Sequence, residues 1–400
     1  MKTVGKLTVR GTALLAIANM YLLITLPKTV ESTTQGTNVR RILASETESG
    51  RTPSVQYYFF DQDSIIDSYS GGYADLDSGK PVSIHTTYNA FSVTKTFTAL
   101  AVMQLVERRL VGLDSPVIEY VPDFPYDPDI TVRQLLSHTA GLPNPIPLAW
   151  IHAEEDHATF DEKEFFRSVV KKNRRMKYHP EATFSYSNLG YVFLGQLVER
   201  VSGMSYEEYV EKNIIRKLPV SSDRLGFTIR SAEDHARGYI ERMSFTNLAL
   251  GLFIEKSKFM DRSKGKWKPF KPFYVNGSSY GGLIGTPLAF VRYLQEMLKP
   301  ESELLGEVSR NRMFEEQTTY DGERTGMCLS WFTGNLLGQR YLAHAGGGGG
   351  YYCEIRLYPE LGKGSVIFFN RTGIADEKFL DKVDVCYLKE QVMIPEMTNA

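Results

Sequence analysis

The sequence predicts an α/β (α+β) fold in which an antiparallel sheet, flanked by the terminal helices, stands beside an all-helical lobe. Three observations support this fold class. Strand-like runs gather near both ends of the 400-residue chain. The middle of the chain follows helical periodicity, punctuated by glycine and proline. A final amphipathic run closes the sequence. The economical packing puts the strands of both ends in one sheet covered by the terminal helices.

The first strands are predicted after a short helix with polar flanks in the run TQGTNVRRILASETESG. Residues Tyr57 to Phe60 lead into the turn Asp61-Gln62-Asp63, and the chain resumes at Ile65. Alternation on both sides of a short polar turn is typical of a hairpin. We therefore expect two antiparallel strands before residue 80.

The central segment predicts a series of helices. Ser92 to Leu110 is apolar nearly all round, which indicates a buried central helix. Four later runs each predict a helix: TVRQLLSHTAGLP, NLGYVFLGQLVERVSG, SYEEYVEKNIIRKL and TPLAFVRYLQEML. Between them, residues 252–275 are basic, aromatic and poor in periodicity, so we expect a long solvated surface loop. The alternative is that its aromatic residues roof the cleft: Trp267, Phe270, Phe273 and Tyr274.

The last quarter changes to strand periodicity. Four strand-like runs are expected, MCLSWFTG, RYLAHAG, YYCEIRLYPE and GSVIFFNRTG, and then a closing helix in ADEKFLDKVDVCYLKEQV. The predicted sheet lobe therefore comprises residues 36–90 and 316–400, and the mainly helical lobe residues 91–315. A cleft between two lobes is a natural place for a site.

Composition excludes some classes of function. The formal net charge is −1, with 46 basic and 47 acidic residues, which argues against nucleic acid as a partner. The cysteines Cys328, Cys353 and Cys386 form no C-x-x-C pair, so neither a zinc site nor a redox dithiol is indicated. One disulfide and three buried thiols remain alternatives. The oligomeric state is left open.

Residues 1–35 predict a signal or anchor segment. Lys2, Lys6 and Arg10 precede an apolar run at residues 12–27. That run is shorter than the roughly 20 residues that span a bilayer, and is close to the apolar part of a signal peptide. We expect export to the periplasm or medium. The alternatives are a membrane anchor through residues 12–27 and an amphipathic helix on a cytoplasmic protein.

The stretch NAFSVTKTFTAL, residues 89–100, places a lysine three residues after a serine in an otherwise small and apolar run. If Ser92 begins a helix, Lys95 lies one turn further along the same face. An ammonium there stabilises alkoxide character on the serine, and a desolvated lysine can accept the proton itself. Many helices carry this spacing by chance, with serine as cap and lysine reaching water, so further motifs must decide.

A second motif is FSYSNLG, residues 184–190. The phenol of Tyr186 beside a lysine can relay a proton, because the cation favours the charged phenolate. The amide of Asn188 can donate to a substrate carbonyl or toward Lys95. The alternative for Tyr186 is a buried tyrosine with a satisfied hydroxyl.

A third motif is LAHAGGGGGYY, residues 342–352. Glycines Gly346 and Gly347 after His344 allow bare backbone to approach another group closely. Their N–H groups, with that of Ser92, can face a developing oxyanion. The alternative is a flexible turn between two strands.

S-x-x-K, Y-S-N and H-x-G in this order resemble the serine β-lactamase and penicillin-binding protein superfamily, specifically class C β-lactamases and family VIII carboxylesterases. The phrases ITVRQLLSHTAGLP, SYGGLIGTPLAFVRYLQEML and GSVIFFN resemble it too, and the likeness runs from about residue 38 to 392. The resemblance implies the two-lobed β-lactamase/transpeptidase-like fold without metal or organic cofactor. It implies Ser92 as acylated nucleophile, Lys95 as its activator and Tyr186 as general base and leaving-group acid.

The resemblance also implies that Asn188 orients substrate and that the N–H groups of Ser92 and Gly347 form the oxyanion hole. His344 then stands where many relatives carry a lysine that binds the carboxylate of a β-lactam. A histidine with an ordinary pKa is mostly neutral at pH 7. We therefore expect a carboxylesterase-type hydrolase of small esters or less acidic amides.

Three other functions remain open. Two of them, a β-lactamase and a D-alanyl peptidase of the penicillin-binding type, would take a β-lactam or a D-amino-acid peptide. The third is a binding pseudoenzyme without turnover.

A competing motif is GSSYG at residues 277–281, where Ser279 is followed by Asp321 and His344 in the order of α/β-hydrolases. That fold needs a helix immediately after the serine, whereas here a helix is predicted only from Pro287. We therefore prefer Ser92. His138, in LLSHTAG, is interpreted as a structural histidine at a helix end.

Overall fold

The computed structural model describes residues 39–372 and 378–392. The segment 1–35, interpreted above as a signal or anchor, lies outside the described residues. Within the described part, no helix combines the length and apolar character needed to cross a membrane.

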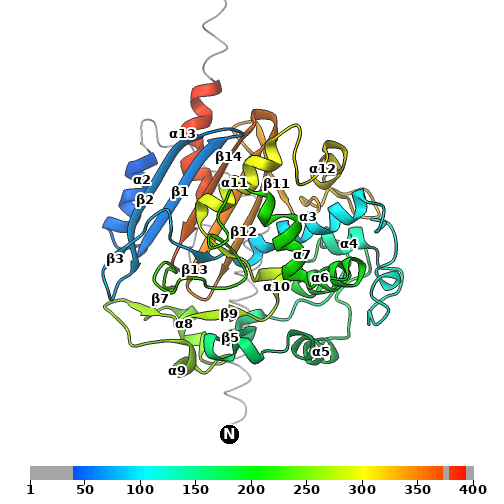
Figure 1. Ribbon diagram of the computed structural model, residues 1–400, viewed down its shortest axis with the longest axis horizontal. Coiled ribbons are helices and arrows are strands. Elements are labelled where there is room, and N and C mark those ends of the chain that lie inside the picture. The colour runs from blue at the N-terminus through cyan, green and yellow to red at the C-terminus, as the bar shows by residue number, and fades with distance from the viewer. Residues whose placement is uncertain (1–38, 373–377, 393–400) are drawn as a thin grey trace, which may run out of the picture.

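A seven-stranded antiparallel sheet forms the centre of the molecule, in the order β11-β12-β13-β14-β1-β2-β3 (Figure 1). Its strands are β1 (Ser54–Asp61), β2 (Ile65–Asp75), β3 (Lys80–Pro81), β11 (Phe332–Leu336), β12 (Gln339–Gly348), β13 (Tyr351–Tyr358) and β14 (Lys363–Phe369). Strand β1 pairs with β14, with Tyr57 opposite Ile367. The two ends of the chain therefore share one sheet, as the sequence predicts.

Small sheets connect the rest of the chain. They contain β4 (Tyr88–Asn89), β5 (Ile151–Ala153), β6 (Leu225–Gly226), β7 (Tyr239–Glu241), β8 (Trp267–Pro269), β9 (Phe273–Val275) and β10 (Ile284–Gly285). They pair as β4-β10-β6, β5-β9 and β7-β8.

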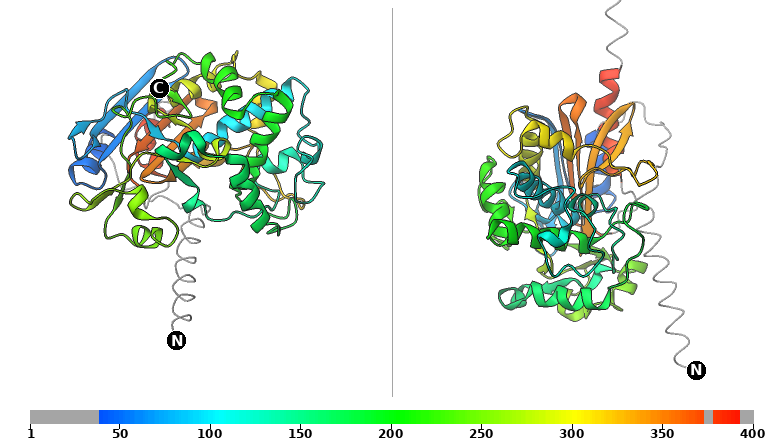
Figure 2. Two further views of the ribbon diagram at one scale, coloured as in Figure 1. Left: turned by 60° about the horizontal axis from the view of Figure 1, so that its bottom comes forward. Right: turned by 90° about the vertical axis from the view of Figure 1, so that its right-hand side faces the viewer.

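Helices lie on both faces of the sheet and form the lobe beside it (Figure 2). Their bounds are α2 (Val39–Glu48), α3 (Thr94–Glu107), α4 (Val132–Leu136), α5 (Glu162–Lys172), α6 (Asn188–Ser202), α7 (Tyr206–Asn213), α8 (Phe245–Leu250), α9 (Lys256–Phe259), α10 (Ser278–Gly281), α11 (Pro287–Leu298), α12 (Glu307–Met313) and α13 (Phe379–Val392). Helix α11 falls in the range predicted for the helical lobe, yet it packs against β1 and β14 of the sheet.

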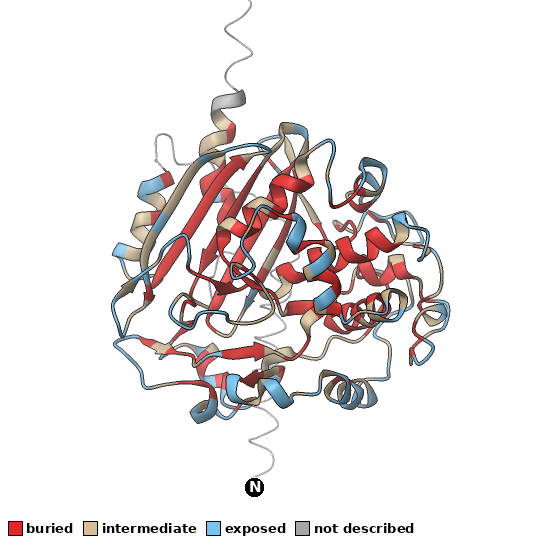
Figure 3. Ribbon diagram, viewed as in Figure 1, coloured by how far each residue is buried: buried red, intermediate tan, exposed pale blue. Residues whose placement is uncertain are grey.

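The alternation along β1 explains the two cores. Tyr57 and Phe59 point into a cluster with α2 and α13, whereas Tyr58 and Phe60 point into the larger cluster that includes α3 and α11. Side chains of a strand alternate between its faces, so both faces of β1 are covered. Figure 3 shows β1, β13, β14 and α3 almost entirely buried, whereas β2 and β11, toward the edges of the sheet, are partly exposed.

Two sequence-based expectations are wrong. The run TVRQLLSHTAGLP holds only the short helix α4, because His138 adopts a left-handed backbone with φ of 58° and ends the helix early. Residues 252–275 do not form a solvated loop. The segment contains α9, β8 and β9. Four of its aromatic side chains are buried: Trp267, Phe270, Phe273 and Tyr274.

The cysteines of the interior are thiols. Cys328 donates to the carbonyl of Phe314 at 3.1 Å, and Cys353 donates to the carbonyl of Ala90 at 3.3 Å. Both are fully buried. They are not joined to each other.

Candidate active site

Ser92 lies in a single 3₁₀ turn, Phe91–Val93, that leads directly into α3. The residue before it, Phe91, has φ of 46°, in the left-handed region that a bulky side chain rarely adopts. Such a conformation costs about 1–3 kcal/mol and persists only where the surroundings hold it. Ser92 itself is half-buried.

Lys95 reaches back from the first turn of α3 to this hydroxyl. Its Nζ donates to Ser92 Oγ at 3.0 Å and to the carbonyl of Tyr280 at 2.8 Å. The serine-to-lysine spacing of three residues therefore brings both groups together, as the sequence predicts.

The lysine is fully buried, and no salt bridge joins it to a carboxylate of the described residues. Its Nζ lies 5.0, 5.5 and 5.2 Å from the ring centres of Tyr186, Tyr191 and Tyr280. Burial lowers the pKa of Lys95 well below its ordinary value, since nothing anionic compensates the lost hydration. A neutral amine at this place can accept a proton.

Tyr186 completes a triad of polar groups. Its hydroxyl donates to Ser92 Oγ at 2.9 Å, although the two residues are 94 positions apart. Ser92, Lys95 and Tyr186 therefore converge on one oxygen atom.

His138 holds the segment that carries Tyr186, a role that sequence reasoning missed. The N–H of Ser185 donates to the His138 carbonyl at 2.7 Å, and the N–H of Ser187 donates to His138 Nδ1 at 3.2 Å. The imidazole also packs on the Tyr186 ring, with centres 4.2 Å apart. Burial and the nearby Lys95 keep the pKa of His138 well below its ordinary value, so the ring is neutral.

Asn188 begins helix α6 next to the tyrosine. Its backbone N–H and its side-chain Nδ2 both donate to Asn144 Oδ1, at 3.1 and 3.2 Å. Its own Oδ1 is buried without a hydrogen-bond partner among the described residues. The amide is therefore oriented by Asn144, a contact that no sequence pattern indicated.

His344 lies on β12 and is 1% exposed. Its Nδ1 is 2.9 Å from the Ala345 carbonyl, which makes Nδ1 the donor and leaves Nε2 as an acceptor. Burial and the nearby Lys95 lower the pKa of His344 to about 3, so the ring is neutral. It therefore supplies no positive charge to a substrate near pH 7.

The glycines after His344 lie against the nucleophile. A Cβ on Gly346 would stand 2.1 Å from the Ala90 carbonyl oxygen and 3.1 Å from the Ser92 nitrogen. Bare backbone is therefore required at Gly346. Gly347 follows it, exposed, on the same strand.

The competing nucleophile Ser279 lies elsewhere. It is buried in α10, where a Cβ on Gly195 would meet its Oγ at 2.5 Å. Asp321 lies in an exposed turn, where Thr319 donates to its carboxylate. Within the described residues, no hydrogen bond joins Ser279 to Asp321 or His344, so these three residues form no triad.

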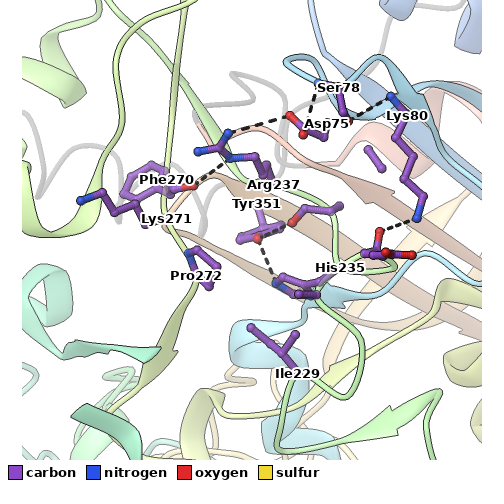
Figure 4. Close-up of a pocket in the computed structure, with 14 residues that line it drawn as sticks. Asp75, Ser78, Lys80, Ile229, His235, Arg237, Phe270, Lys271, Pro272 and Tyr351 are labelled. Atoms are coloured by element: carbon purple, nitrogen blue, oxygen red, sulfur yellow. Dashed lines mark hydrogen bonds and ion pairs between the residues drawn. The ribbon is translucent and has the colours of Figure 1, made fainter. Parts of the chain in front are cut away.

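A separate cavity of about 430 Å³ is lined by Tyr351, His235 and Arg237, among other residues (Figure 4). Its polar groups are engaged by the protein itself. Arg237 pairs with Asp77 at 2.9 Å and also with Asp261, and His235 Nε2 lies 3.1 Å from the Tyr351 hydroxyl. In the described part of the chain, no group of three His, Cys, Asp or Glu residues could hold a metal ion.

Comparisons with known proteins agree with this geometry. A family model described as Beta-lactamase matches residues 39–387. Penicillin-binding protein 4* of Bacillus subtilis (strain 168) is 25% identical over 312 residues, which cover 77% of this chain and 66% of that protein. The chain thus spans slightly less than two thirds of that relative's length.

Solved structures resemble the fold. The octameric penicillin-binding protein homologue from Pyrococcus abyssi aligns with a TM-score of 0.71 at 23% identity, covering 88% of this chain and 77% of that one. EstCE1, a hydrolase with promiscuous acyltransferase activity, aligns with a TM-score of 0.66 at 19% identity, covering 87% and 97%. At these identities the likeness concerns the fold alone.

Proposed function

The chain belongs to the beta-lactamase family, and from this premise we propose that it is a serine acyl-hydrolase of the carboxylesterase type. It cleaves a small ester or a weakly acidic amide through an acyl-enzyme on Ser92. One observation carries the proposal: Lys95 Nζ and the Tyr186 hydroxyl both lie within 3.0 Å of Ser92 Oγ.

In the acylation step, Ser92 Oγ bonds to the carbonyl carbon of the substrate and its proton passes to the pair formed by Lys95 and Tyr186. The carbonyl electron pair moves to oxygen and then returns to expel the alkoxide or amine. Tyr186 delivers a proton to this leaving group, so the pair receives one proton and gives one back. The lowered pKa of Lys95 suits it to this exchange near neutral pH.

The developing oxyanion is assigned to the backbone N–H groups of Ser92 and Gly347. The close approach of Gly346 to the Ser92 nitrogen supports this assignment, because it puts the glycine strand beside the turn of the nucleophile. One such donor is typically worth a factor of about 10²–10³ in kcat.

In deacylation the same pair acts on water. A water molecule gives its proton to Lys95 and Tyr186 while its oxygen bonds to the acyl carbon. Ser92 Oγ leaves, takes the proton back, and the acid product is released.

The preference for esters is inferred from His344. A β-lactam carries a carboxylate that must be paired with positive charge, and the neutral, buried His344 supplies none. Asn188, whose amide is held by Asn144, is proposed to orient the substrate carbonyl.

The decisive experiment is a substrate panel on the wild-type protein and Ser92→Ala. The panel comprises short p-nitrophenyl esters, nitrocefin and a D-alanyl peptide. We expect ester hydrolysis by the wild type, slow nitrocefin turnover, and loss of both in Ser92→Ala. A high kcat/KM for nitrocefin with slow ester cleavage would make the protein a β-lactamase instead.

Labelling with a fluorescent penicillin, followed over time, separates the remaining alternatives. Rapid release of the acyl group from Ser92 indicates a hydrolase, and a stable acyl-enzyme indicates a penicillin-binding role. A folded protein that neither the penicillin nor a fluorophosphonate labels at Ser92 would be a pseudoenzyme.

A further inference from the structure

A group of exposed apolar side chains, here called the apolar tip, lies on and around helix α8. It consists of four side chains that are more than half exposed: Met243 at 87%, Phe245 at 54%, Leu248 at 73% and Leu252 at 52%. They fall within ten consecutive residues, whereas exposed large apolar residues elsewhere are scattered. Single exposed apolar residues need no explanation, but a group of four in one place indicates an interaction surface.

The fold does not need these four side chains. Helix α8 is capped by Ser244, whose Oγ accepts from the N–H of Asn247 at 3.1 Å, and Asn247 Nδ2 donates to the Arg242 carbonyl at 2.7 Å. Ala249 and Leu250 point inward and are buried. The helix is therefore amphipathic, with its inner face satisfied and its outer face unpartnered among the described residues.

The segment that carries the apolar tip is rich in basic residues. Residues 242–271 contain eight basic and two acidic residues, in a chain whose totals are 46 and 47. The basic residues are Arg242, Lys256, Lys258, Arg262, Lys264, Lys266, Lys268 and Lys271. This segment therefore carries an excess of positive charge, although the chain as a whole is nearly balanced.

Part of this charge is compensated by neighbouring elements. Three lysines have carboxylate partners, Lys258 with Asp156 at 2.6 Å, Lys264 with Asp77 at 3.5 Å, and Lys266 with Glu241 at 3.7 Å. The acidic residues of the segment are Glu255 and Asp261, and Asp261 pairs with Arg237. Within the described ranges, five of the basic residues have no ion-pair partner: Arg242, Lys256, Arg262, Lys268 and Lys271.

We propose that the apolar tip and the basic segment that carries it dock on the surface of an anionic lipid bilayer. The tip is a short helix with a following turn that stands at the lower edge of the molecule (Figures 1 and 3), so its apolar side chains can enter the headgroup boundary together. Unpaired lysines and arginines beside it complement lipid phosphates and carboxylates. Exposed apolar side chains beside basic ones fit an anionic bilayer better than an apolar groove of another protein. Such a groove would bury the basic side chains without anionic partners.

The test uses the full chain and a local probe. In Leu248→Trp, tryptophan emission is expected to shift to the blue on adding vesicles of equimolar phosphatidylserine and phosphatidylcholine, and brominated lipid should quench it. The same substitution at Val308, which is 78% exposed on α12 at the far side of the molecule, is the matched control and should respond no more than the wild type, whose own three tryptophans set the background. Binding through residues 12–27 alone would leave the response of Leu248→Trp equal to that of Val308→Trp and would overturn the proposal.

A second measurement is vesicle flotation of a double variant, Phe245→Ser with Leu248→Ser, against Val308→Ser with Tyr320→Ser. Removing each apolar side chain of the tip should weaken partitioning by about tenfold, and the control pair should not change it. Binding should weaken with added salt and on pure phosphatidylcholine vesicles. Equal flotation of the two variants would refute the proposal, and so would an effect seen only on self-association, which would make the tip an interface between copies.

Discussion

Replacing Gly346 with alanine would put a methyl group 2.1 Å from the Ala90 carbonyl oxygen. Ordinary contact begins near 3.4 Å, so strand or turn must move by about 1.3 Å. Ala90 O accepts from the Val93 N–H at 3.2 Å, which closes the turn that carries Ser92. The displacement is therefore transmitted to the nucleophile and to its N–H.

The expected loss follows from this displacement. A misplacement of about 1 Å can cost about 10²-fold in rate, and losing one oxyanion donor about 10²–10³. We expect kcat for p-nitrophenyl acetate to fall by about 10²–10³ in Gly346→Ala. Active-site titration with a fluorophosphonate and a thermal unfolding curve count the folded protein in each sample.

The matched control is Gly347→Ala, one residue along. A Cβ there meets only Tyr351 and Tyr352, at 3.6 Å, because strand side chains alternate between faces. It should retain activity within about threefold of wild type, since its N–H remains. If Gly346→Ala folds and is as active as Gly347→Ala, the inferred close contact between Gly346 and the turn that carries Ser92 is wrong.

Three further predictions concern Lys95 and His138 at the candidate active site and Arg356 in the sheet. In the pH profile of kcat/KM, the pKa at which activity falls on the acidic side should lie well below the ordinary lysine pKa of 10.5. The reason is that activity is lost only when falling pH protonates the buried Lys95. A fall in activity near pH 10.5 would contradict this. The variant His138→Phe removes the acceptor for the Ser187 N–H and should lower kcat by about tenfold or more in steady-state kinetics. The variant His138→Asn, which keeps a side-chain acceptor, should recover part of this kcat. Equal losses in both variants would argue against positioning of the Tyr186 segment by this hydrogen bond. The variant Arg356→Leu leaves Glu354 and Asp384 without their buried cation. It should lower the free energy of unfolding, measured in urea, by about 3–5 kcal/mol. A decrease below about 1 kcal/mol would show that the ion cluster does not stabilise the fold.

The sequence predicted the sheet well because its signals are local. Strands β1, β2, β12, β13 and β14 fall largely within the strand-like runs bounded by turn residues, and both ends of the chain share one sheet as the sequence predicts. The run MCLSWFTG only partly overlaps β11, which begins at Phe332. Ser92, Lys95 and Tyr186 were singled out from their residue types and order, and the structure brings their side chains together.

What the sequence could not reveal depends on distant contacts. The end of α4 at Leu136 follows from the left-handed backbone of His138, a conformation that histidine adopts more often than most residues but still too rarely to be predicted at one position. The aromatic residues of 252–275 looked solvated because their burial comes from packing against other segments, such as Phe273 against Phe91 at 6.3 Å. The hold of Asn144 on Asn188 joins residues 44 positions apart and leaves no pattern in the sequence.

The pairing of β1 with β14 also constrains how the chain acquires its shape during synthesis. Val55 lies opposite Phe369, so the inner edge of β1 stays without its neighbour until residues 363–369 have left the ribosome. The intervening helices depend on nearer neighbours in sequence and can form earlier. A ribosome stalled before residue 363 would thus display a helical intermediate with an unsatisfied strand edge, the kind of species that chaperones bind.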